Sequence, residues 1–170
     1  SVDQGATTIW ERWNSYTVQG GYGPVSMNSF NHYAYGIIAE WMFRHMAGIA
    51  PDETQAGFKH FFLQPYPDTR ATLRYSQQRI TSVDADFASD YGSIKAEWQC
   101  DGSKEMTYRV TIPANTSATL RLPVADGIYV YESGQEAELA EGVTYMGTAD
   151  GYAVYEVGSG SYLFSVSSEI

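Results

Sequence analysis

The stretch EMTYRVTIPANTSATLRLPV, residues 105–124, decides the fold class of this chain. Its first half places the apolar residues Tyr108, Val110 and Ile112 at every second position, which is the period of a half-buried strand. Short runs of the same character, rich in Tyr, Val, Ile, Thr and Phe, flank it at 58–67, 72–83, 91–100, 127–134 and 152–168. Turn signals separate these runs and no helical period intervenes. Residues 51–170 are therefore predicted to form an antiparallel β-sandwich domain.

Residues 27–49, MNSFNHYAYGIIAEWMFRHMAGI, change to the i, i+3, i+4 rhythm of an amphipathic helix. Residues that can cap or stop the helix flank this run, with Ser26, Asn28 and Ser29 at its start and Gly48 and Pro51 at its end. The opposite face of this helix is not clearly polar either. We therefore expect the helix to lie inside a larger helical assembly. The chain starts at Ser1 rather than Met, and its first motif follows within ten residues. We expect a C-terminal fragment of a longer protein, in which residues 1–50 close a helical domain.

The composition excludes several classes of partner and site. Lys and Arg number 10 against 20 Asp and Glu in 170 residues, a formal net charge of −10, and the basic residues are scattered, so nucleic acid is not an expected partner. No apolar stretch approaches the ~18 residues of a membrane-spanning helix, so a membrane is not expected either. One cysteine and three dispersed histidines form no metal-ligand pattern. The sequence also lacks phosphate-loop, dinucleotide and nucleophile-elbow motifs, so we expect neither a metal nor another cofactor.

Residues 1–24 form a glycine-rich segment that carries the motif Trp10-Glu11-Arg12-Trp13. Glycine and proline at this density predict an irregular loop, and a loop that is also rich in aromatic residues is typical of one that covers a pocket or a partner surface. Two interpretations of the motif stay open. In one, the indoles stack on the C–H-rich face of a sugar ring while the Glu11 carboxylate accepts hydrogen bonds from sugar hydroxyls. In the other, Glu11 pairs with Arg12 and the tryptophans fill a core.

His32 is the histidine that we consider for contact with a ligand. It lies near the start of the predicted helix, with Asn28 one turn earlier and Asn31 beside it. A helix N-terminus favours a neutral imidazole and points hydrogen-bond donors at a bound group. The alternative is a histidine whose hydrogen bonds are satisfied within the core. His45 and His60 have no visible partner in the sequence and are predicted to be structural.

Two N-terminal motifs, GATTIWERWNS (5–15) and SMNSFNHYAYGIIAEWMFRHMAGI (26–49), together resemble the end of the catalytic domain of bacterial α-L-rhamnosidases, glycoside hydrolase family 78. The later segments YGSIKAEW (91–98) and VTIPANTSATLRLP (110–123) resemble the C-terminal β-sandwich of the same family. The resemblance implies that residues 1–50 are the last active-site loop and helix of an (α/α)6 barrel. It also implies that a rhamnose-containing carbohydrate is the partner.

The resemblance further implies roles for individual residues. The family inverts the configuration at the anomeric carbon, and Glu11 matches the position of its general base. His32 matches a histidine that contacts the rhamnose, while Trp10 and Trp13 flank the base and are expected to line the pocket. Asn14 stands where the family usually has Asp, so a role that needs a charge at this position is not expected.

The general acid of the family lies far upstream of this motif. We therefore expect the 170-residue chain to be inactive by itself and the full-length enzyme to be active. We also expect the apolar helix and loop, once separated from the rest of the barrel, to drive self-association of the truncated chain.

Three alternatives remain at the level of the sequence. The sandwich could be a carbohydrate-binding module, in which case Trp98, Tyr129 or Tyr131 should form an exposed aromatic platform. It could instead be purely structural and cap the barrel. Finally, the chain could belong to a different (α/α)6 glycosidase, such as an α-L-fucosidase, closed by the same kind of sandwich.

Overall fold

The computed structural model describes residues 1–73, 78–103 and 105–168. The chain divides into two compact units, an N-terminal unit, Ser1–Trp41, and a C-terminal unit, Met42–Ile170. Within the described residues, no helix is long and apolar enough to cross a membrane. Each unit is considered by itself below.

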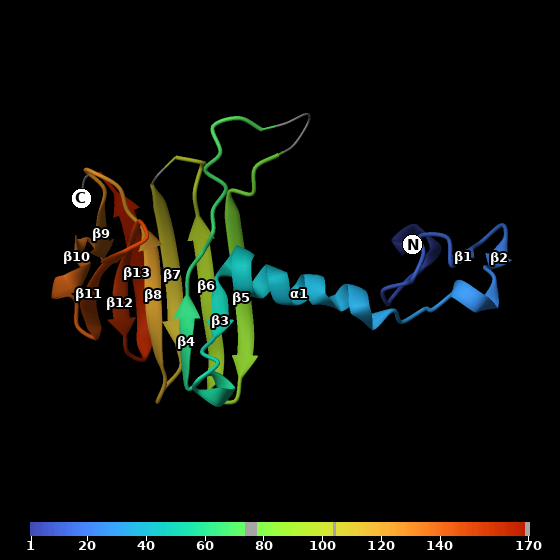
Figure 1. The fold of residues 1–170 in the computed structure, drawn as a ribbon, viewed down its shortest axis with the longest axis horizontal. Helices are drawn as coiled ribbons and strands as arrows, with labels where there is room; N and C mark the ends of the chain where they lie inside the picture. The colour runs from blue at the N-terminus through green and yellow to red at the C-terminus, as the bar shows by residue number, and fades with distance from the viewer. Residues whose placement is uncertain (74–77, 104, 169–170) are drawn as a thin grey trace. The chain divides into compact units, whose positions relative to one another are not determined.

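The C-terminal unit is a sandwich of two β-sheets (Figure 1). The six-stranded sheet has the order β10 (Gln135–Glu136), β9 (Tyr129–Glu132), β13 (Gly160–Ser167), β7 (Met106–Ile112), β6 (Gly92–Gln99), β5 (Ser82–Ser89). The five-stranded sheet has the order β11 (Val143–Ala149), β12 (Tyr152–Val157), β8 (Ser117–Pro123), β4 (His60–Leu63), β3 (Ile49–Pro51). The predicted antiparallel β-sandwich is confirmed, with one exception. Strand β4 pairs with β8 in parallel, with His60 opposite Ser117.

Besides the helical stretch described below, the described part of this unit contains two short 3₁₀ helices, η5 (Ala56–Phe58) before β4 and η6 (Ala137–Leu139) after β10. Of the strand run that the sequence predicts at 72–83, residues 74–77 lie outside the described residues. The prediction is wrong for 72–73 and 78–81, which form no strand, and β5 begins only at Ser82 and pairs along its length with β6.

The core of the sandwich follows the alternation seen in the sequence. On β7, Tyr108, Val110 and Ile112 are buried while the residues between them face outward, and β8 buries every second residue against them. Trp98 on β6 is among the largest buried side chains, and its Nε1 donates a hydrogen bond to the carbonyl of Met46 at 2.6 Å. The Tyr108 hydroxyl donates in the same way to the carbonyl of Ala47, at 3.1 Å. These two bonds hold the chain before β3 onto the six-stranded sheet.

The helical segment is shorter than the sequence predicts. A 3₁₀ turn η3 (Tyr33–Gly36), the α-helix α1 (Ile37–Trp41) and a π-helical stretch η4 (Met42–Ala47) follow one another, and Ile49 already belongs to β3. The predicted start of the helix is part of the loop instead, where Asn28 Nδ2 donates to the carbonyl of Ser15 and the Ser29 N–H donates to Glu11. Helical structure therefore starts at Tyr33 rather than near residue 27.

The rest of the N-terminal unit is irregular, as predicted for a glycine-rich segment. It contains two 3₁₀ turns, η1 (Val2–Gln4) and η2 (Val25–Met27), and a short hairpin of β1 (Tyr16–Thr17) and β2 (Gly21–Tyr22).

Gly48, which joins η4 to β3, is required by both its conformation and its surroundings. Its φ is +80°, and a Cβ at this position would lie less than 3.0 Å from the backbone of Gln64. We expect Gly48→Ala to lower the free energy of unfolding by about 2–6 kcal/mol, because a positive φ and a backbone clash each cost about 1–3 kcal/mol. Urea unfolding of the chain measures this loss.

Gly57→Ala is the matched control for this prediction. Gly57 also has a positive φ, +77°, but a Cβ there would enter open space. Gly57→Ala should therefore lower the free energy of unfolding only by the cost of the positive φ, about 1–3 kcal/mol. If both variants lost the same free energy of unfolding, the predicted clash with the Gln64 backbone would not contribute to the loss in Gly48→Ala.

Candidate active site

Two segments of the N-terminal unit lie against each other and carry the residues that the sequence singled out. The Glu11 N–H donates to the carbonyl of Ser29 at 2.8 Å, and the His32 N–H donates to the carbonyl of Ile9 at 2.8 Å. The Thr8 hydroxyl also donates a hydrogen bond to the carbonyl of Phe30. Glu11 and His32 are distant in sequence, but these bonds place them on neighbouring segments of one loop cluster.

The carboxylate of Glu11 is anchored through one oxygen only. Its Oε2 accepts the backbone N–H of Ser29 at 2.8 Å, while none of the described residues bonds Oε1. The side chain is half-buried, and the ion pairs among the described residues do not include one between it and Arg12. A carboxylate that is fixed at one oxygen and open at the other can accept a proton from a bound water molecule, because its orientation is set before that water arrives.

Arg12 is directed into the loop instead. Its Nε and Nη2 are buried without a hydrogen-bond partner in the described structure, and so is Oδ1 of Asn28. A Cβ on Gly23 would lie 2.7 Å from Arg12 Nη2. The glycine-rich run therefore makes room for the guanidinium, which the sequence did not predict.

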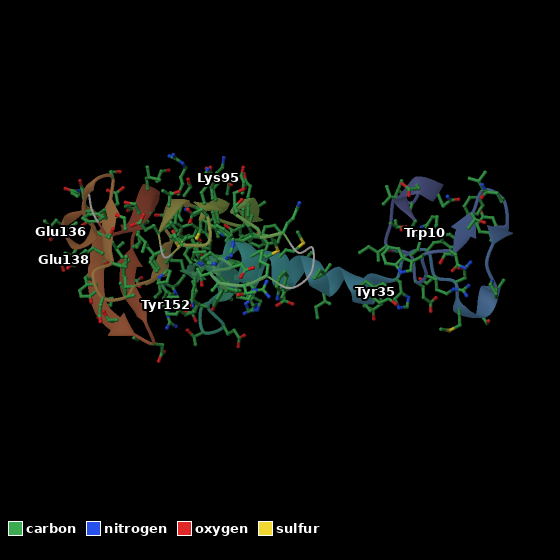
Figure 2. The ribbon with its side chains drawn as sticks, turned by 90° about the horizontal axis from the view of Figure 1, so that it is seen from above. Trp10, Tyr35, Lys95, Glu136, Glu138 and Tyr152 are labelled. Atoms are coloured by element: carbon green, nitrogen blue, oxygen red, sulfur yellow. The ribbon has the colours of Figure 1, made fainter. Side chains whose placement is uncertain are left out.

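The aromatic residues of the motif have different surroundings. Trp10, labelled in Figure 2, packs edge to face on Phe30 with ring centroids 5.1 Å apart. Trp13 is 86% exposed and so fills no core in this unit. The His32 ring lies 4.8 Å from the ring of Tyr35, whose hydroxyl donates to the Glu11 carbonyl at 3.4 Å. Trp10 and Tyr35 thus support the segment that carries Glu11, whereas the Trp13 side chain is left exposed.

Sequence reasoning missed two supports of this cluster. Ser15 is fully buried, and its carbonyl accepts both the Gly23 N–H and Asn28 Nδ2. The anchor of Glu11 is the backbone N–H of Ser29, which leaves no mark on residue type.

A carbohydrate-binding module was expected to expose Trp98, Tyr129 or Tyr131, and two of these three residues are not exposed. Trp98 is 2% exposed and Tyr131 is 7% exposed, because both pack within the sandwich, whereas Tyr129 is 58% exposed.

His60 is buried in the C-terminal unit, and it has partners that the sequence did not reveal. Its Nδ1 lies 2.9 Å from Asp52 Oδ2, and its Nε2 lies 3.1 Å from the Thr119 hydroxyl. Hydrogen bonds from the Thr54 hydroxyl and backbone N–H, with a smaller share from His60, hold the pKa of Asp52 below its usual value. Among the described residues, no group of three or more His, Cys, Asp or Glu is arranged to hold a metal ion.

Comparison with known proteins gives two family matches that together cover most of the chain. Residues 48–137 match the bacterial α-L-rhamnosidase C-terminal domain. Residues 1–46 match the bacterial α-L-rhamnosidase 6 hairpin glycosidase domain, in agreement with the expected end of an (α/α)6 domain.

Individual relatives agree with these matches. The chain is 38% identical over 165 residues to an α-L-rhamnosidase of Streptomyces avermitilis, covering 97% of the chain and 14% of the relative. It is 42% identical over 123 residues to one of Formosa agariphila, covering 72% of the chain and 12% of the relative.

Solved structures show the same likeness. The crystal structure of the Streptomyces avermitilis α-L-rhamnosidase complexed with L-rhamnose matches with a TM-score of 0.70 at 37% identity, over 98% of this chain and 14% of that one. The α-L-rhamnosidase from Dictyoglumus thermophilum matches with a TM-score of 0.69 at 26% identity, over 97% and 16% of the two chains.

A β-sandwich preceded by the loop and helix of a hairpin glycosidase domain defines a glycosidase-type chain. More closely, the chain belongs to the bacterial α-L-rhamnosidase family. It spans only about one seventh of the length of the relatives that it matches, so it corresponds to one part of such proteins.

Proposed function

We propose that this chain is the part of an inverting α-L-rhamnosidase that supplies the general base, Glu11. In this proposal, residues 1–50 are the active-site loop and helix of the catalytic domain, and residues 51–170 are the β-sandwich that closes it. The substrate is a glycan or glycoside with a terminal α-L-rhamnosyl residue. The observation that carries the proposal is the Glu11 carboxylate, bonded at Oε2 by the Ser29 N–H and open at Oε1.

Inverting hydrolysis needs two carboxyl groups about 6.5–9.5 Å apart, with a water molecule between the base and the anomeric carbon. Glu11 takes a proton from that water, whose oxygen attacks the anomeric carbon on the face opposite the leaving group. A second carboxylic acid, which the proposal assigns to residues outside this chain, protonates the leaving oxygen. The Ser29 N–H fixes the direction of Oε1, so that the water is held in line with the bond that breaks.

The other candidate residues take supporting roles in this proposal. His32 is assigned to contact with the rhamnose, because it lies on the segment paired with that of Glu11. Trp10 and Trp13 flank the base and offer ring faces to the sugar. Trp13, which is 86% exposed, is open to such a contact.

The anchor of Glu11 can be tested without changing Glu11 itself. Ser29→Pro removes the backbone N–H that Oε2 accepts, whereas Ser29→Ala keeps it. In the full-length enzyme we expect Ser29→Pro to lower kcat by about 10–100-fold, since a misplaced catalytic group costs rates of this order, with little change in KM. Steady-state kinetics on an aryl α-L-rhamnoside give both values.

Ser29→Ala serves as the matched control and should keep kcat within about twofold, since the Glu11 anchor belongs to the backbone. Melting temperatures of both variants show whether the fold persists. If the proline and alanine variants had the same kcat in folded enzymes, the N–H would not position the base.

The isolated chain is expected not to hydrolyse rhamnosides, because a base without its acid partner loses the about 10²–10⁴-fold contribution of general acid catalysis. Incubation of the purified 170-residue chain with a chromogenic aryl α-L-rhamnoside checks this. Turnover by the purified chain that is lost in Glu11→Gln, and so does not come from a contaminant, would contradict the expected inactivity.

Self-association of the isolated chain is proposed on the same grounds. Apolar side chains of α1, namely Ile37, Ile38 and Trp41, are about half exposed or more. They offer a surface for a second copy of the chain.

A further inference from the structure

The C-terminal unit has a cavity that the proposed function does not use. It has a volume of about 790 Å³ and lies where β9 and β10, at the edge of one sheet, meet β11 and β12, at the edge of the other. This size falls within the about 300–1,000 Å³ of small-molecule sites. We call it the tyrosine cleft, since its lining includes Tyr129, Tyr131, Tyr145 and Tyr155, together with the carboxylates of Asp126, Glu136 and Glu138. Glu136 and Glu138 are labelled in Figure 2 at that end of the sandwich.

The backbone of β11 explains why an aromatic ring is left open here. Tyr145 pairs directly with Tyr155 of β12, so the two side chains share one face of the sheet, and their ring centroids are 5.3 Å apart. Tyr155 is 5% exposed, whereas Tyr145 is 42% exposed. An inward-facing position at the sheet edge is thus not covered by the opposite sheet.

A β-bulge fixes the orientation of this ring. The register of β11 against β12 shifts between Tyr145 and Gly147, and the Tyr145 hydroxyl lies 2.8 Å from that of Thr148, which also lines the cleft. Bulges of this kind re-aim side chains at functional edges of sheets. The Tyr145 ring is therefore held in place before any ligand arrives.

The charged residues that line the cleft indicate which chemical class of ligand it can bind. Among the described residues that line the cleft there is no Lys, Arg or His, so a phosphate or carboxylate would meet only negative charge. Carboxylates accept hydrogen bonds and cannot donate them. Burial raises the pKa of Tyr155 to about 12, with smaller contributions from the neighbouring Tyr145 and Glu138. The carboxylates and the tyrosine rings together fit a ligand that is not an anion, carries several hydroxyl donors and has an apolar face for the rings.

We propose that the tyrosine cleft binds a neutral saccharide. The Tyr145 ring stacks on the C–H face of the sugar, and Glu136 and Glu138 accept hydrogen bonds from its hydroxyls. The choice of a rhamnose-containing saccharide rests on the proposed function, while the choice of a neutral saccharide rests on the cleft alone. The site lies in the unit that does not contain Glu11, so it would hold a glycan rather than cleave it.

The test is a titration of the ¹⁵N-labelled 170-residue chain with an α-L-rhamnosyl disaccharide, followed through the backbone amide signals. Maltose and spermidine are titrated in parallel. We expect saturable shifts at Tyr145, Thr148 and neighbouring residues with the disaccharide. Tyr145→Ala should weaken binding by about tenfold or more, since it removes an aromatic contact made in a partly desolvated site.

Tyr91→Ala is the matched control, since Tyr91 is 41% exposed but lies on the turn between β5 and β6, outside the cleft. It should bind as the unchanged chain does. If Tyr145→Ala proves unfolded, Glu138→Gln replaces it in the test, because Glu138 is exposed and its substitution should not disturb the fold. Glu138→Gln should also weaken binding. Glu53→Gln, at an exposed position outside the cleft, should leave binding unchanged. Binding is read from the signals of cleft residues and catalysis from kcat, so failure of this site and failure of the proposed catalytic role give different results.

Several outcomes would overturn the inference. Shifts that do not saturate, or shifts confined to residues outside the cleft, would remove the site. Binding of spermidine without either saccharide would show a cation site instead. Binding of maltose as tightly as the rhamnosyl disaccharide would keep a neutral-saccharide site but overturn its assignment to rhamnose.

Discussion

Glu11→Gln in the full-length rhamnosidase is expected to lower kcat by about 10²–10⁴-fold, the usual contribution of a general base. The amide has the size of the carboxylate and can still accept the Ser29 N–H through its oxygen, so the loop should keep its structure. It cannot take a proton from water, so the attacking oxygen remains a poor nucleophile. The measurement is kcat on an aryl α-L-rhamnoside, with the melting temperature as the check on folding.

A second Glu→Gln variant separates this role from a general effect of charge. Glu53 is exposed and belongs to the C-terminal unit, whereas Glu11 belongs to the N-terminal unit. Glu53→Gln should leave kcat unchanged. A near-normal kcat for Glu11→Gln would refute its role as the base, whatever the control shows.

Trp98→Ala is expected to cause the largest loss of stability, about 3–5 kcal/mol from the cavity alone. Trp98 is 2% exposed in the core, and it also gives up its hydrogen bond to the Met46 carbonyl, worth about 1 kcal/mol, which ties η4 to the sheet. The free energy of unfolding of the isolated chain in urea, followed by far-UV circular dichroism, measures the loss.

The chain offers a matched substitution in Trp13→Ala. Trp13 is 86% exposed, so its removal should change stability by no more than about 0.5 kcal/mol. Trp98→Phe should fall between the two, because it keeps most of the buried ring but loses the N–H. If the two alanine variants were equally stable, the sandwich core would not be organised around Trp98.

The sandwich was predictable where the alternation of side chains is strict. Tyr108, Val110 and Ile112 mark one buried face of β7 in the sequence and in the structure alike. Strand β11 was missed, because its bulge between Tyr145 and Gly147 breaks the alternation and leaves most of the strand exposed. The helix was predicted too long at its start. Asn28 and Ser29 form hydrogen bonds with Ser15 and Glu11, and these tertiary contacts override the local helix signal.

The candidate site was predictable only as far as residue types go. A carboxylate between two indoles, together with the resemblance to rhamnosidases, led to Glu11. Its support by the Ser29 N–H could not be foreseen, since a backbone donor has no residue signature. The tyrosine cleft was hidden for a related reason, because Tyr145 and Glu138 become neighbours only when the edges of two sheets meet.

Chemical rescue of Glu11→Ala by azide, in the full-length enzyme, tests the role of Glu11 most directly. Azide needs no deprotonation, so it can replace the water that the base would activate. It forms a C–N bond at the anomeric carbon while the C–O bond to the aglycone breaks and the aglycone oxygen receives its proton from the general acid. We predict that azide restores turnover and that the product is β-L-rhamnosyl azide, of inverted configuration. An α-configured azide, or hydrolysis by Glu11→Ala as fast as by the unchanged enzyme, would contradict a base at this position.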